Sequence, residues 1–245
     1  MTPTDSQPRL AGLLTANVAL VVDRLPLPFP PWARRVVARA IAVAWDELST
    51  QALDADLSVG SMKETEITTA LQMILNDMRQ SPRESCPAFS GQAFQHVVRD
   101  ASEVSFDARS IEKAPDLAFR TAAMSPGAAG GPEPTLLAEA KIVTPSPRHR
   151  VGYCTNGIMR FVKGEYAWYM DCGLMVGYVR DGASGLLASF LAVGDRYNTE
   201  SAPSDGTAEA CLQGRRVYFS VHRREWMHLG GSAPGDISIS HLWLD

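Results

Sequence analysis

The sequence predicts a domain that mixes helices and strands, of the α/β or α+β class, and three observations lead to that prediction. Two segments in the first third of the chain repeat apolar residues at helical spacing. From about Val97 onward the pattern changes to short extended segments, and further helical segments separate some of them. Of the 245 residues, 45% are hydrophobic and 20% are charged, which suits a globular chain with a buried core and excludes a disordered one.

The first helix is expected over residues 31–51. The proline at its first position suits a first helical turn, because its missing N–H would have no partner there anyway. Apolar residues recur every three or four positions from Trp32 to Leu48, as they do on the buried side of a helix. Residues 1–60 are predicted to form an N-terminal helical extension that packs on the outside of the main domain, residues 61–245.

The second helix is expected over residues 61–79. Ser61, followed three residues later by Glu64, matches a capping box, and Pro82 prevents much continuation. At about 100° per residue, Glu64 falls close to the apolar stripe of this helix, whereas Glu66 points well away from it. The stripe consists of Ile67, Leu71, Leu75 and Met78.

The rest of the chain is expected to form strands with two interposed helices. The strands are expected at residues 103–106, 117–121, 136–143, 174–180, 217–221 and 237–242. The helices are expected at residues 156–170 and 185–193. Residues 126–134, which are rich in Gly, Ala and Pro, are expected to form a long hairpin connection.

Charge and cysteine content narrow the possible functions and compartments. The net charge of −4 gives no overall basic field, so contact with nucleic acid would need a local basic face or a bound metal. The four cysteines form no CxxC pair and are too sparse for a disulfide framework, which favours buried thiols in a reducing compartment. The apolar stretch at residues 10–22 is too short to span a bilayer, and no clear secretory signal precedes it. A cytoplasmic protein without a membrane partner is therefore expected.

Charged residues stand out in two of the expected strands. Side chains alternate along a strand, so Glu139 and Lys141 share one face, while the residues between and beside them are apolar. Asp116 begins the preceding strand, and a hairpin would bring it alongside Glu139. Two carboxylates and an ammonium that converge suit phosphodiester hydrolysis. The carboxylates can hold Mg²⁺, which activates a water molecule, and the lysine can orient or deprotonate that water.

These residues resemble the motif of the PD-(D/E)xK nuclease superfamily. In that superfamily a hairpin carries Pro-Asp on one strand and Glu-x-Lys on the next, and here the matching residues are Pro115, Asp116, Glu139 and Lys141. The resemblance covers about residues 61–180. It implies a restriction-endonuclease-like core, with a central mixed sheet flanked by helices and preceded by the N-terminal helical extension.

The resemblance also implies an activity and a set of site residues. It implies a nuclease that cleaves DNA with Mg²⁺, or with Mn²⁺ in its place, and such small domains often act as effectors in restriction or antiviral defence. Asp116 and Glu139 would bind the metal, and Lys141 would act on the attacking water. A helix before the hairpin often supplies another acidic ligand in this superfamily, and Glu64 is the better candidate because it lies near the apolar stripe.

Each of these residues also has a simpler interpretation. Asp116 after a proline is a common turn residue, and Glu139 with Lys141 could be a solvent-facing pair on an edge strand. The apolar residues around that pair favour a buried central strand instead. Glu64 could be only the capping acid of its helix. The alternative functions are a catalytically inactive nuclease-fold subunit that assembles with a protein partner or a second copy, and an unrelated α+β ligand-binding protein with a chance motif.

Basic residues after the motif are weaker candidates for contact with DNA phosphates. Arg148 and Arg150 follow Lys141 in an expected proline-rich loop, and Arg160 and Lys163 lie on the expected helix beyond it. A solvated polar face would have the same composition.

Overall fold

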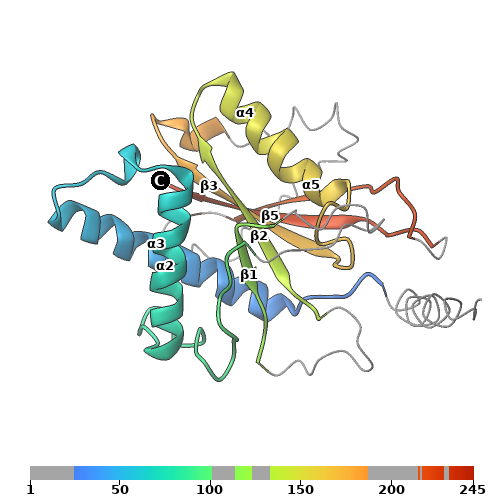
Figure 1. Ribbon diagram of the computed structural model, residues 1–245, viewed down its shortest axis with the longest axis horizontal. Coiled ribbons are helices and arrows are strands. Elements are labelled where there is room, and N and C mark those ends of the chain that lie inside the picture. The colour runs from blue at the N-terminus through green and yellow to red at the C-terminus, as the bar shows by residue number, and fades with distance from the viewer. Residues whose placement is uncertain (1–24, 101–113, 123–132, 187–214, 216, 229–231) are drawn as a thin grey trace, which may run out of the picture.

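The computed structural model describes residues 25–100, 114–122, 133–186, 215, 217–228 and 232–245. Within these ranges the chain forms a five-stranded sheet in the order β1-β2-β3-β5-β4, covered by helices (Figure 1). The predicted class, a mixed α/β fold with a mixed sheet flanked by helices, is confirmed. The strands are β1 (Leu117–Phe119), β2 (Leu136–Val143), β3 (Cys172–Val179), β4 (Val217–His222) and β5 (Ile237–Leu244).

The three central strands, β2, β3 and β5, run parallel to one another, while β1 and β4 pair antiparallel at the two sides. The predicted strand at residues 136–143 has the observed bounds, and those at 174–180, 217–221 and 237–242 differ from the observed strands by a residue or two at an end. The predicted strand at 103–106 lies outside the described residues, as does most of the predicted helix at 185–193, whose first residues end a 3₁₀ turn (Ala183–Leu186).

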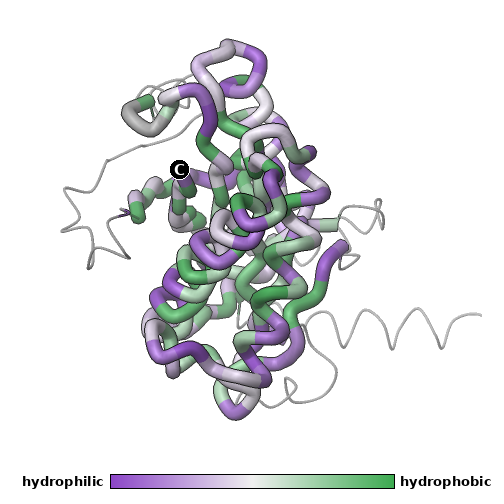
Figure 2. The backbone as a smooth tube through the Cα atoms, turned by 90° about the vertical axis from the view of Figure 1, so that its left-hand side faces the viewer, coloured by the Kyte–Doolittle hydropathy of each residue, from purple (hydrophilic) through white to green (hydrophobic). Residues whose placement is uncertain are grey.

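Helices cover both faces of the sheet. Helix α2 (Pro31–Asp54) lies on one face, where Trp45 stacks on Tyr178 of β3 with ring centroids 5.6 Å apart. Helix α3 (Glu64–Gln80) packs against α2 and reaches β2. Figure 2 shows hydrophobic and hydrophilic residues interspersed along this part of the backbone. Helix α3 has one buried side, whereas the middle of α2, residues 40–45, is apolar and buried all round. The side chains of α2 belong to the same buried core as those of the sheet. The division of the chain at residue 60 stays a prediction.

A continuous helical segment covers the opposite face. It consists of α4 (Pro147–Tyr153), one π-helical turn (Cys154–Ile158) and α5 (Met159–Val162). The prediction of a loop followed by a helix over residues 156–170 is wrong at both ends. Pro147 occupies a first helical turn, where proline is favoured, so a residue interpreted as a loop former begins the helix. Gly164 has a φ of +66°, a left-handed conformation that ends the helix early.

The start of α3 also differs from the prediction. The helix begins at Glu64, and Ser61 lies before it in a 3₁₀ turn (Val59–Ser61). The predicted Ser61–Glu64 capping box is therefore wrong. The backbone N–H of Lys63 donates instead to Glu66 Oε2 at 2.8 Å, so Glu66 is the acid that caps the helix. This arrangement leaves the side chain of Glu64 available for contacts outside its own helix.

Candidate active site

The candidate site lies where β1 leaves one side of β2 without a neighbouring strand. Strand β1 begins at Leu117, and along β2 it pairs with the first three residues and no farther. Farther along β2, side chains take the place of the missing strand. Asp116 Oδ2 accepts a hydrogen bond from the N–H of Ala140 at 2.7 Å, and Glu64 Oε2 accepts one from the N–H of Ile142 at 3.0 Å. Two carboxylates thus satisfy the open edge of a central strand.

The ammonium of Lys141 lies among four oxygen atoms. Its Nζ donates to Glu64 Oε1 at 3.0 Å and to the carbonyl oxygen of Ala140 at 2.7 Å. It also forms ion pairs with Glu139 Oε1 at 2.8 Å and with Asp116 Oδ2 at 3.9 Å. An ammonium has three hydrogens to donate, and the three shortest contacts account for all of them.

Glu139 is the most deeply buried of the acids, with a side chain that is 2% exposed. Its Oε1 forms an ion pair with Lys141 and accepts a hydrogen bond from Arg160 Nη1, which lies 3.1 Å away. Its Oε2 accepts a hydrogen bond of 2.7 Å from the hydroxyl of Tyr166. A buried carboxylate is tolerated only when it is paired and hydrogen-bonded, and these three donors meet that condition.

The local sequence explains how Arg160 and Tyr166 reach Glu139. The π-helical turn before α5 shifts the register of the helix, and Gly157 within that turn lies so close to β3 that a Cβ atom there would overlap the side chain of Met175. Gly164 then reverses the chain and brings Tyr166 back toward the sheet. The helix and the turn after it therefore place a cation and a hydroxyl on the same carboxylate.

The charges of the cluster affect one another. Burial, together with the neighbouring carboxylates of Glu139 and Glu64, raises the pKa of Asp116 to about 6 although Lys141 and the N–H of Ala140 oppose the shift. Burial alone would lower the pKa of Lys141, but the same three carboxylates outweigh it and raise that pKa above its ordinary value. Lys141 is therefore an ammonium ion in this arrangement, and Asp116 takes up a proton more readily than an ordinary aspartate does.

The oxygen donors fit a divalent metal in their chemistry. Three carboxylates and the carbonyl oxygen of Ala140 approach one cationic group, and oxygen ligands of this kind are what Mg²⁺ and Mn²⁺ prefer. Within the described part of the chain, no three His, Cys, Asp or Glu side chains are already arranged around a metal-sized point. The ammonium of Lys141 lies between the carboxylates, so a metal could bind there only if that ammonium moved.

All four residues predicted for the site, Glu64, Asp116, Glu139 and Lys141, come together in this cluster. The interpretation of Glu139 and Lys141 as a solvent-facing pair on an edge strand is wrong, because both side chains are largely buried, although β1 does not extend along β2 as far as these residues. Glu64 contacts β2 and does not cap its helix.

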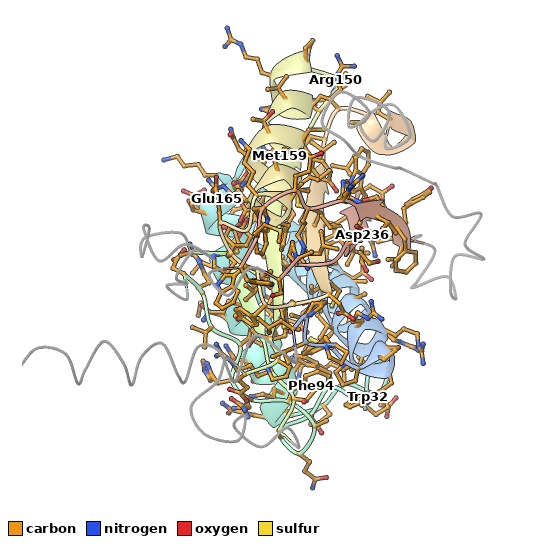
Figure 3. All side chains as sticks on the ribbon, turned by 90° about the vertical axis from the view of Figure 1, so that its right-hand side faces the viewer. Trp32, Phe94, Arg150, Met159, Glu165 and Asp236 are labelled. Carbon is orange, nitrogen blue, oxygen red and sulfur yellow. The ribbon has the colours of Figure 1, made fainter. Side chains whose placement is uncertain are left out.

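The four basic residues predicted to contact DNA are not gathered in one place. Arg160 is engaged by Glu139, whereas Lys163 and Arg148 are exposed. The predicted proline-rich loop around Arg148 and Arg150 is the first part of α4. Figure 3 shows Arg150 at the outer end of that helix, with Met159 and Glu165 successively farther along the segment. Contact of these residues with DNA stays a prediction.

The contacts of Arg160 and Tyr166 with Glu139 were not predicted from the sequence. Tyr166 belongs to the buried core, but burial of a tyrosine also requires a partner for its hydroxyl. That requirement is a signal in the sequence, although nothing in the sequence identifies the partner.

Comparisons with known proteins leave the family open. No family model, curated protein or solved structure matches the chain. Among the helices that the structure describes, none has the length and apolar character needed to cross a membrane.

Proposed function

We propose that the protein is a nuclease with a restriction-endonuclease-like core that uses Mg²⁺ or Mn²⁺ to hydrolyse phosphodiester bonds in DNA. The convergence of three carboxylates and the ammonium of Lys141 at the open edge of β2 carries this proposal. The order of elements along the chain also supports it. A helix, α3, precedes the β1–β2 hairpin, and a helical segment then leads to β3, which is parallel to β2.

The three acids would hold the metal, together with the carbonyl oxygen of Ala140. A bound divalent ion lowers the pKa of a water molecule and neutralises charge on the phosphate. Two of these acids are positioned by backbone N–H groups of β2, which leaves each of them an oxygen that the strand does not use. The site is therefore preorganised by the backbone, with the ligands held by hydrogen bonds from a rigid strand.

Lys141 would act on the attacking water. Burial by itself lowers the pKa of this lysine, and only the carboxylates reverse that effect. Once the carboxylates are engaged elsewhere, the amine can accept a proton from water, or orient the water through a hydrogen bond. As an ammonium it can stabilise the charge that develops on the phosphate.

The charge balance explains why such a site would need a cation before it could bind DNA. Among the residues that the structure describes, the carboxylates of Glu64, Asp116 and Glu139 form ion pairs with two cationic groups, those of Lys141 and Arg160. The cluster is therefore negative when the three acids are ionised, and it repels a phosphodiester backbone. A divalent ion would reverse the sign of this local charge.

The proposal is tested by incubating the purified chain with supercoiled plasmid, linear duplex and single-stranded DNA, each in Mg²⁺, Mn²⁺ or EDTA. We expect cleavage in either metal, none in EDTA, and none by Lys141→Ala at equal concentration. RNA of the same sequence shows whether the activity is confined to DNA. Absence of cleavage from every substrate would refute the proposal, and DNA binding without cleavage would favour an inactive nuclease-fold subunit.

A further inference from the structure

Glu139 is held by two groups from α5 and the turn after it, and the following inference about these groups rests on the proposed function. Tyr166 Oη lies 2.7 Å from Glu139 Oε2, and Arg160 Nη1 lies 3.1 Å from Oε1. Neither residue contacts Asp116 or Glu64 in the described hydrogen bonds and ion pairs. Whatever Arg160 and Tyr166 do for the site, they do through Glu139.

Arg160 and Tyr166 leave some acceptor positions on the carboxylate oxygens of Glu139 free. Each carboxylate oxygen offers about two acceptor positions. Glu139 Oε1 has both of them filled, by Lys141 and Arg160, and Oε2 has one filled by Tyr166. One position therefore remains on Oε2, and a second becomes free on Oε1 when Lys141 moves away. After the lysine departs, each oxygen of Glu139 has one free acceptor position and keeps its other donor.

The two donors are themselves fixed. Tyr166 is fully buried, and its ring meets that of Phe161 edge to face, with centroids 4.9 Å apart. Arg160 lies in the short helix α5, and its Nε forms a second ion pair with Glu165 Oε2 at 3.9 Å. Tyr166 has Gly164 and Ala167 nearby in left-handed backbone conformations, so the path of the chain around it is specific. Tyr166 therefore has little freedom to follow a carboxylate that rotates, and the partly exposed Arg160 is restrained by two carboxylates.

We infer that Arg160 and Tyr166 are positioning residues for Glu139. They hold its carboxylate in one orientation, and Arg160 supplies the charge partner that it keeps when Lys141 moves to act on the water. Without them, Glu139 would lose its fixed rotamer at the moment when it has to bind a metal. This role differs from phosphate contact, the role that the sequence suggests for Arg160.

The test measures metal affinity rather than activity alone. Tyr166→Phe removes one hydroxyl and leaves the ring in the core. Its Mn²⁺ dissociation constant, measured by isothermal titration calorimetry on the full chain, is expected to rise by about 10- to 100-fold, as is usual when a partner of a metal ligand is removed. The matched control is Tyr153→Phe. Tyr153 is also fully buried, and its hydroxyl contacts His241 and Trp243 instead of the site.

Variants of Arg160 separate positioning from general stability. Arg160→Gln is expected to weaken Mn²⁺ binding, and Arg160→Lys to restore part of it, because lysine keeps the charge but cannot reproduce the planar guanidinium. Melting temperatures in EDTA show how far each variant is destabilised. The inference is supported if Tyr166→Phe loses affinity while Tyr153→Phe keeps it.

Three outcomes would overturn the inference. If wild type binds Mn²⁺ and cleaves DNA while Tyr166→Phe and Arg160→Gln bind Mn²⁺ equally well, the positioning role is wrong and the proposed nuclease function stands. If Tyr153→Phe loses as much affinity as Tyr166→Phe, the effect reports destabilisation and the role is again wrong. If wild type neither binds Mn²⁺ nor cleaves DNA, both the inference and the proposed function fail.

Discussion

Asp116 is expected to destabilise the metal-free fold at neutral pH, and replacing it with asparagine should make the fold more stable. Burial and the neighbouring acids raise the pKa of this carboxyl from 3.8 to about 6. Between these two pH values the folded chain binds more protons than the unfolded chain. The stability that comes from having Asp116 protonated in the fold is therefore fully present below about pH 4 and is lost as the pH rises through 6.

The size of the effect follows from the two pKa values. The difference between 3.8 and about 6 corresponds to about 3 kcal/mol in the free energy of unfolding at pH 7.5. The side chain of Asp116 is 19% exposed, so partial solvation reduces this figure, and we expect about 1–3 kcal/mol. Asparagine keeps an oxygen that can accept the N–H of Ala140, so Asp116→Asn removes the charge and preserves the hydrogen bond.

The assay is urea unfolding of wild type and Asp116→Asn in EDTA at pH 7.5, 5.5 and 3.8. The stability gained by the variant should be largest at pH 7.5 and should disappear at the lowest pH. Asp54→Asn, which changes an exposed aspartate at the end of α2, is the control and should change stability little at any pH. Equal stability of wild type and Asp116→Asn at pH 7.5, or a gain that does not depend on pH, would refute the reasoning. The same substitution should abolish Mn²⁺ binding, which would identify a residue that serves function at a cost in stability.

Further predictions concern the lysine, the two acids of α3 and a buried histidine pair. Lys141→Ala should abolish cleavage, and Mn²⁺ should raise its melting temperature more than that of wild type, because a cation replaces the missing ammonium; equal shifts would contradict this. Glu64→Gln should strongly reduce single-turnover cleavage in saturating Mn²⁺, whereas Glu66→Gln should spare cleavage and cost less than about 1 kcal/mol in urea unfolding, because glutamine can still accept the N–H of Lys63; the reverse pattern would show that the roles are exchanged. Burial lowers the pKa of His222 to about 4 and that of His241 to about 3, so their contribution to stability should fall as the pH drops below 6.5. The test uses Asp116→Asn, in which the carboxyl of Asp116 no longer titrates over this range; urea midpoints of this variant that stay constant from pH 6.5 to 4.5 would contradict the prediction.

The sequence by itself determined the features that depend on local periodicity. Alternation along residues 136–143 defined β2 with its observed bounds and placed Glu139 and Lys141 on one face. Helical periodicity was enough to prefer Glu64 over Glu66 as the acid that faces the sheet, although the capping assignment at the start of that helix was wrong. Such patterns follow from backbone geometry over a few residues, so they can be recognised without knowledge of the tertiary structure.

The tertiary structure alone decided how the site is assembled. Because β1 begins only at Leu117, opposite Ala138, the later residues of β2 have no neighbouring strand on that side. The N–H of Ile142 can therefore donate to Glu64, which is 78 positions away in the sequence. The π-helical turn and the left-handed Gly164 determine that Tyr166 reaches Glu139. These contacts depend on where separate elements come to rest against one another. Periodicity within a segment carries no information about that placement, because it is set by the packing of the whole core.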